Sequence, residues 1–153
     1  MLQRIQTIYL LIITVLSAIM LFFPQAGLLS AEWQLEISSR YIFYKINAGS
    51  GYFLIVILLT VIEVVIPVIS LTAMLLFKKR ILQIRLIIIN IILMAGVYAI
   101  IFVYLLAAAK TLQADWYLNI VAVIPLINIV LSFMAIRAID KDETLVKSLD
   151  RLR

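Results

Sequence analysis

The sequence contains neither cysteine nor histidine, and only 14% of its 153 residues are charged. Without cysteine, the chain has no disulfide framework, no thiol nucleophile and no thiolate metal site. The absence of histidine removes the commonest general base and the commonest metal ligand. Glycine occurs only four times, and no glycine-rich phosphate loop can be recognised. We therefore expect no enzymatic activity, no cofactor and no bound metal.

Hydrophobic residues make up 66% of the chain, and the mean hydropathy is +1.20. A soluble domain of this length could not bury so much apolar surface, because it needs a polar exterior. A bilayer reverses that requirement, and a helix needs about 20 apolar residues to cross it. We therefore predict an integral membrane protein that has the lipid bilayer as a partner. Membrane orientation explains the net charge of +5 better than nucleic acid binding does.

Four apolar stretches are each long enough to span a membrane, and they are expected to be helices because lipid cannot satisfy free backbone groups. They cover residues 5–23, 52–77, 86–109 and 117–139, with an outer loop at 24–51 and a tail at 140–153. The first run is longer than the apolar part of a signal peptide, so we expect it to remain as a helix. The pattern predicts an all-α integral membrane protein, a single membrane domain over residues 1–153 that forms a four-transmembrane-helix antiparallel bundle.

The lysines and arginines lie mostly on one side of the predicted membrane. That side receives ten of them: Arg4, Lys78, Lys79, Arg80, Arg85, Arg137, Lys141, Lys147, Arg151 and Arg153. The opposite side receives Arg40, Lys45 and Lys110. Cytoplasmic loops carry the excess of basic residues in membrane proteins. We therefore predict a multi-pass protein with both termini in the cytoplasm.

The outer loop contains two segments with strand character. Polar and apolar residues alternate over residues 32–38, which is the period of a half-buried strand. Residues 41–46 are rich in aromatic strand formers. One interpretation is a short outer β-hairpin. The other is an irregular loop whose Trp33, Tyr41 and Tyr44 lie in the headgroup layer.

The tail has the pattern of an amphipathic helix. Leu145, Leu149 and Leu152 recur at positions i, i+4 and i+7, which gives one narrow apolar stripe. Acidic residues lead and basic residues follow, as the helix dipole favours. We predict a cytoplasmic C-terminal amphipathic helix that lies on anionic lipid or docks onto a partner. The alternative is a solvated extension of the fourth helix.

Glu63 lies about eleven residues into the second apolar stretch, near mid-membrane, where an ionised carboxylate is costly. Pro67 follows four residues later and leaves the carbonyl of residue 63 without its usual helical donor, so a kink is predicted. Thr60 and Ser70 share this face of the helix at three- and four-residue spacings. The second stretch therefore presents a polar face that includes its acid.

The fourth stretch has a similar face, which carries Asn128 and Ser132. Pro125 predicts a second kink there. Asn90 supplies a polar group from the third stretch, so we predict an intramembrane polar seam between the helices. On a functional interpretation, Glu63 is a proton or cation site with Asn128 as its partner. On a structural interpretation, it is a protonated acid that hydrogen-bonds across helices or a contact to another membrane protein, since polar groups commonly hold membrane helices together.

Both ends of the chain resemble a known family of small four-helix membrane proteins. The resemblance rests on MLQRIQTIYL at residues 1–10, RAIDKDE at 137–143 and DRLR at 150–153. That family is seen mainly in Bacteroidota and is described only as a domain of unknown function. The resemblance implies a bacterial inner (cytoplasmic) membrane location. It implies no activity, ligand or catalytic residue.

The two ends would lie together on the cytoplasmic side and form a candidate docking face. Its members are Gln3, Arg4, Gln6, Asp142, Glu143, Leu145, Leu149, Asp150, Arg151 and Arg153. The alternative is that the tail closes the bundle by pairing Arg4 with Asp140 or Asp142. We expect a non-catalytic accessory or scaffold subunit that binds other membrane-protein subunits of an inner-membrane assembly, such as export or envelope-biogenesis machinery. The alternative function is a small transporter or proton-coupled carrier that uses Glu63.

Overall fold

The computed structural model describes residues 3–29, 34–37, 50–77, 79–113 and 115–150. The elements in this part of the chain are α1 (Gln3–Met20), β1 (Ala26–Leu29), β2 (Gln34–Ile37), α2 (Ser50–Leu75), α3 (Arg80–Leu112), β3 (Asp115–Leu118), the 3-10 turn η2 (Ile120–Val123) and α4 (Ile124–Asp150). Each of the four apolar stretches corresponds to one of the α-helices. The chain is therefore mainly helical, with a small sheet.

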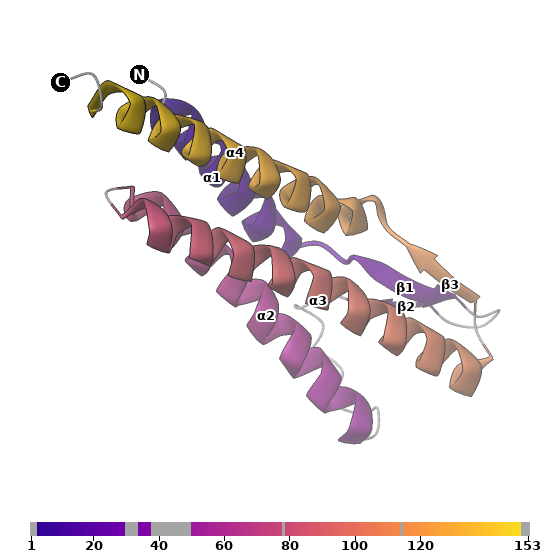
Figure 1. The fold of residues 1–153 in the computed structure, drawn as a ribbon. Helices are drawn as coiled ribbons and strands as arrows, with labels where there is room; N and C mark the ends of the chain where they lie inside the picture. The colour runs from indigo at the N-terminus through magenta and orange to yellow at the C-terminus, as the bar shows by residue number, and fades with distance from the viewer. Residues whose placement is uncertain (1–2, 30–33, 38–49, 78, 114, 151–153) are drawn as a thin grey trace.

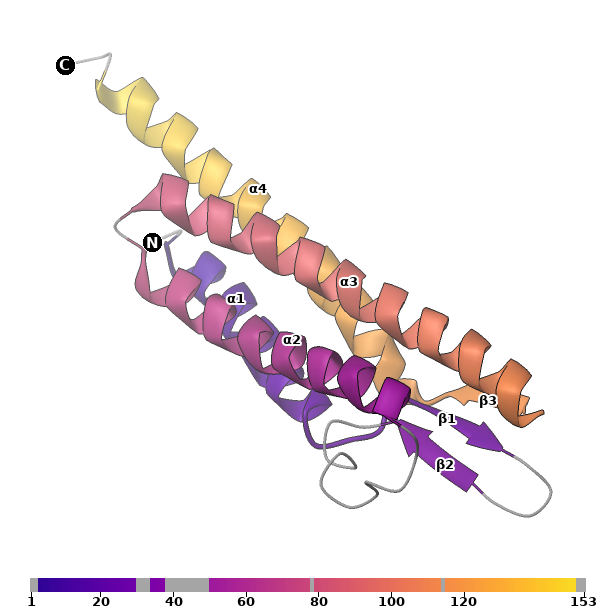
Figure 2. The same cartoon turned by 90° about the horizontal axis from the view of Figure 1, so that it is seen from below.

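The helices pack in cyclic order, because α1 contacts α2 and α4, and α3 contacts the same two helices. The start of α1 and the end of α4 lie at one end of the molecule, and the strands lie toward the other (Figures 1 and 2). In the described part of the chain, three helical runs are long and apolar enough to cross a membrane: Ile57–Leu75, Arg80–Thr111 and Ile120–Lys141. The run in α1, Ile5–Met20, is shorter. These lengths are compatible with a membrane protein.

Each helix buries one stripe of side chains and exposes another that is also apolar. On α1 the buried positions recur every three or four residues: Leu10, Ile13, Ser17 and Met20. The opposite face of the same helix exposes Ile8 and Val15. A surface helix of a soluble protein would carry charged and polar residues there. An apolar outer face is what hydrocarbon requires.

Two helices begin elsewhere than predicted. α3 begins at Arg80 and not at residue 86, since charged residues in its first turns interrupt the apolar run without ending the helix. α4 begins at Ile124 and not at residue 117, because residues 115–118 pair as a strand. α4 then runs unbroken to Asp150, so the tail is an extension of the fourth helix and not a separate helix.

The outer elements form a three-stranded antiparallel sheet in the order β2-β1-β3. β2 falls within the predicted strand at 32–38, but it pairs with β1, with Leu28 opposite Leu35. The second predicted strand, residues 41–46, lies outside the described residues. β1 and β3 were not predicted as strands. β1 is the central strand and buries Ala26, Gly27 and Leu28 in succession, so it lacks the alternation of a half-buried strand.

The sheet is tied to the helices through two chain connections that meet. Asn119, between β3 and η2, donates its backbone N–H to the carbonyl of Gln25 at 2.9 Å. The Asn119 side-chain amide donates to the carbonyl of Pro24 at 3.2 Å. The segment that leaves α1 and the segment that enters α4 are therefore held side by side.

Candidate functional site: a polar interior

Among the residues whose side chains are described, nine polar or charged ones are at most 8% exposed: Gln6, Ser17, Gln25, Glu63, Ser70, Gln83, Asn90, Asn128 and Ser132. All four helices contribute, and Gln25 comes from the connection before β1. Five of the six residues predicted for the seam are in this set, and the sixth, Thr60, is half-buried. The polar faces predicted from helical spacing therefore meet in the interior.

Glu63 accepts a hydrogen bond from Gln25, whose Nε2 donates to the carboxyl Oε1. Both side chains are 1% exposed. This partner differs from the predicted one, Asn128. Gln25 was missed because it follows Pro24 in what the sequence presents as an outer loop. The backbone bond from Asn119 fixes the chain at Gln25 beside the helix ends, and its side chain reaches the interior.

Asn128 instead joins α4 to α1. Its Nδ2 donates to Ser17 Oγ at 3.1 Å, and the Ser17 hydroxyl donates to the Ile13 carbonyl at 2.7 Å. One step toward the termini, Thr14 donates to Ser70 Oγ at 2.9 Å and joins α1 to α2. Hydrogen bonds between membrane helices typically contribute about 1 kcal/mol each. This part of the seam holds helices together.

The two prolines have different places in their helices. Pro67 lies inside α2, so it leaves the carbonyl of Glu63 without its usual donor, as predicted. Pro125 lies in the first turn of α4, where a helix has no need of its N–H. The backbone N–H of Ile124 donates to the carbonyl of Val121. The predicted kink at Pro125 is therefore wrong, because the helix begins there.

Replacing the two prolines by alanine should change stability in opposite directions. Pro67→Ala restores a helical hydrogen bond and is expected to raise the free energy of unfolding by about 1–2 kcal/mol. Pro125→Ala removes buried ring carbons, and it also gives the unfolded chain more conformational freedom. Both effects should lower the free energy of unfolding, together by about 1 kcal/mol. Unfolding in mixed detergent micelles, followed by circular dichroism, measures both. Destabilisation by Pro67→Ala would contradict this account.

Gln6 is the one member of the predicted docking face whose side chain lies among the described residues. Gln6 is 8% exposed, and its Nε2 donates to the carbonyl of Ala138 at 3.3 Å. Gln6 therefore belongs to the contact between α1 and α4 and not to an open surface. The side chains of Gln3 and Arg4 and those of residues 142–153 lie outside the described residues. The predicted pairing of Arg4 with Asp140 or Asp142 falls there as well.

Gln83 is another buried polar group that was not predicted. It is 2% exposed and lies in the first turn of α3, ahead of the predicted start of that helix. Its spacing to Ile87, Asn90 and Met94 is four, three and four residues, so the same stripe continues back to it. A predicted helix that began at Arg80 would have placed Gln83 on this buried stripe. No group of three or more His, Cys, Asp or Glu side chains that could hold a metal occurs among the described residues.

A polar interior inside apolar helices, capped by a small sheet, defines a small helical protein suited to a membrane. The chain belongs to the family described as Domain of unknown function (DUF4293), whose model matches residues 2–152. The family resemblance of the two ends is thereby confirmed. No match was found among the curated proteins or among the solved structures.

Proposed function

We propose that this protein is a non-catalytic accessory subunit of an assembly in the bacterial inner membrane, such as export or envelope-biogenesis machinery. The observation that carries the proposal is the length of α4. Among the residues whose side chains are described, the last buried core residue is Ile139, whereas the helix continues to Asp150. At 1.5 Å per residue, about 16 Å of helix follows Ile139. This projecting end of α4, residues 140–150, extends past the neighbouring helices (Figure 2).

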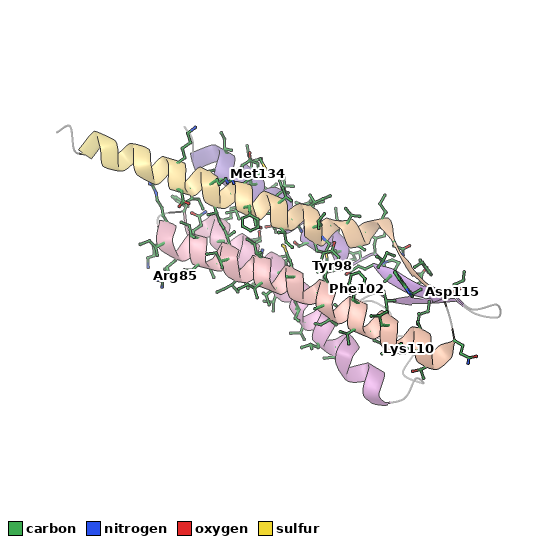
Figure 3. The ribbon with its side chains drawn as sticks, turned by 45° about the vertical axis from the view of Figure 1, so that its right-hand side comes forward. Arg85, Tyr98, Phe102, Lys110, Asp115 and Met134 are labelled. Atoms are coloured by element: carbon green, nitrogen blue, oxygen red, sulfur yellow. The ribbon has the colours of Figure 1, made fainter. Side chains whose placement is uncertain are left out.

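In the proposal all four helices span the membrane, and the projecting end of α4 is cytoplasmic. The exposed apolar faces of the helices support a lipid environment. Arg85 is exposed and lies toward the end that holds the termini, while the exposed Lys110 lies at the sheet end with Asp115 (Figure 3). Arg137 and Lys141 are exposed on α4, whose last turns lie at the end that holds the termini (Figure 1). An excess of basic residues favours the cytoplasmic side. The sheet then lies on the opposite side.

The interaction experiment uses the tagged full chain at native expression, isolated in mild detergent and analysed by mass spectrometry. We expect a stoichiometric membrane-protein partner that is lost when residues 140–153 are deleted. A matched variant, Leu145→Ser with Leu149→Ser, keeps the length of the tail but removes two of the three leucines of its apolar stripe. This variant should also lose the partner. A lone monomer or homo-oligomer from the unmodified chain would contradict the proposal.

A second candidate function is a small proton-coupled carrier, and the burial of Glu63 favours it. An acid that is 1% exposed among apolar helices is a functional candidate by default. A carrier requires a group that gains and loses a proton, so Glu63→Gln would abolish its activity. An accessory subunit tolerates this change, because the amide oxygen still accepts a hydrogen bond. Growth of a strain that carries Glu63→Gln at the native locus separates the two functions.

A further inference from the structure

Five buried side-chain oxygens have no hydrogen-bond partner within the described structure. They are Gln25 Oε1, Gln83 Oε1, Asn90 Oδ1, Asn128 Oδ1 and Ser132 Oγ. An unpaired polar group in an apolar interior costs about 1–3 kcal/mol. Folded proteins pair roughly nine in ten or more of their buried polar groups, either with protein or with ordered water. Five such atoms in one helical interior therefore indicate a ligand that donates hydrogen bonds.

Helical rise places three of the five residues, Asn90, Asn128 and Ser132, at about the same height along α3 and α4. Tyr98 on α3, which lies between α3 and α4 in Figure 3, donates to the carbonyl of Ala122 in η2, the turn just before α4. The two helices run antiparallel (Figure 1). Asn90 lies eight residues before Tyr98 on α3, and the turn of α4 that carries Asn128 and Ser132 lies about eight residues after Ala122. Because antiparallel helices with a similar rise per residue advance by similar lengths, Asn90 is about level with that turn. These three side chains are 2%, 0% and 0% exposed.

The unpaired atoms of this cluster are two carbonyl oxygens, which can only accept, and Ser132 Oγ, which can both accept and donate. The Asn128 amide already donates to Ser17 Oγ, and the Ser17 hydroxyl donates to the Ile13 carbonyl. The unpaired atoms of Asn90 and Asn128 are carbonyl oxygens, which accept but never donate. A group that satisfies them must bring hydrogen atoms of its own. The site therefore fits a small molecule that donates hydrogen bonds to the two carbonyl oxygens and also bonds to the Ser132 hydroxyl.

We propose that Asn90, Asn128 and Ser132 form an interior water-binding site between α3 and α4. A water molecule has two donors and two acceptors, and a buried one typically makes about three hydrogen bonds. Proteins hold about one buried water per 27 residues, so a chain of 153 residues is expected to hold about six. The proposal goes beyond the accessory function and does not depend on it. It makes the middle of the bundle a hydrated interior and not a dry core.

Single cysteines test the proposal, since the chain has none of its own. Ser132→Cys places a thiol at the proposed site, and Ala135→Cys places one on the same helix among apolar neighbours. Both positions are 0% exposed. Each full-length variant is reconstituted in lipid nanodiscs and transferred to D2O, and the S–H stretching band is followed by infrared spectroscopy. We expect the thiol hydrogen at residue 132 to exchange for deuterium at least about tenfold faster than the one at residue 135. A water molecule beside residue 132 makes local unfolding of the protein unnecessary for this exchange.

Equal exchange rates at the two positions would overturn the proposal. A second measurement covers the case in which Ser132→Cys does not fold. In the unmodified chain labelled with ¹⁵N, the side-chain amides of Asn90 and Asn128 should show magnetisation transfer to water. The absence of that transfer from both amides would also overturn the proposal.

Discussion

Replacing Glu63 by leucine is expected to lower the free energy of unfolding by about 3 kcal/mol, whereas Glu63→Gln should change it by less than about 1 kcal/mol. Leucine leaves the Gln25 amide buried without its acceptor, and Gln25 Oε1 is already unpaired. Glutamine keeps an oxygen for the Gln25 amide. Equilibrium unfolding in mixed micelles, followed by circular dichroism, gives both values.

A double-mutant cycle provides the control for this pair. Gln25→Leu alone should also destabilise, since it removes the hydrogen bond that Gln25 donates to the carboxyl of Glu63. The double variant Gln25→Leu with Glu63→Leu should then lose less unfolding free energy than the two single variants lose together, because neither polar side chain remains in the interior. Strict additivity would show that the two side chains do not act together.

Two neighbouring isoleucines on α1 should respond very differently to truncation. Ile13 is 0% exposed and packs in the core, whereas Ile12 is 37% exposed on the outer face. Ile13→Ala is expected to lower the free energy of unfolding by about 3 kcal/mol, from lost burial and from the cavity that remains. Ile12→Ala should lower it by less than about 1 kcal/mol, since lipid or detergent refills the space.

The same micelle unfolding assay measures both isoleucine variants, and each is the other's control because residue type and helix are identical. Comparable losses at residues 12 and 13 would mean that α1 presents a different face to its neighbours than the structure gives it.

Helical periodicity in the sequence was enough to place the main features of the interior. Glu63, Ser70 and Asn128 recur at spacings that put them on inward faces, and all three are buried. Helices in lipid obey a strong local rule, because every backbone group must be paired within the segment. Long apolar runs therefore predict helices well. The exact partners of the polar side chains depend on how the helices pack against each other. The spacing of residues within one helix carries no information about that packing.

The sheet and Gln25 show where local patterns fail. β1 has the sequence AGLL, without the β-branched and aromatic residues typical of strands, and it forms because it has a partner on each side. β3 has strand-forming Trp116 and Tyr117, but their closeness to an apolar run suggested a helix start. Both strands depend on pairing between segments that are far apart in the sequence. Such pairing, and the inward turn of Gln25, could not be deduced from residues nearby.

The length of α3 sets how the protein meets membranes of different thickness. α3 has 33 residues, about 50 Å of helix, whereas a hydrocarbon core is about 30 Å thick. To fit inside by tilting alone, it would have to lean by more than about 50°, beyond the usual range for membrane helices. α3 contacts β1 and β3. In a membrane that this helix crosses, the part of α3 beside the sheet would lie beyond the hydrocarbon, and a thicker bilayer would cover more of that part.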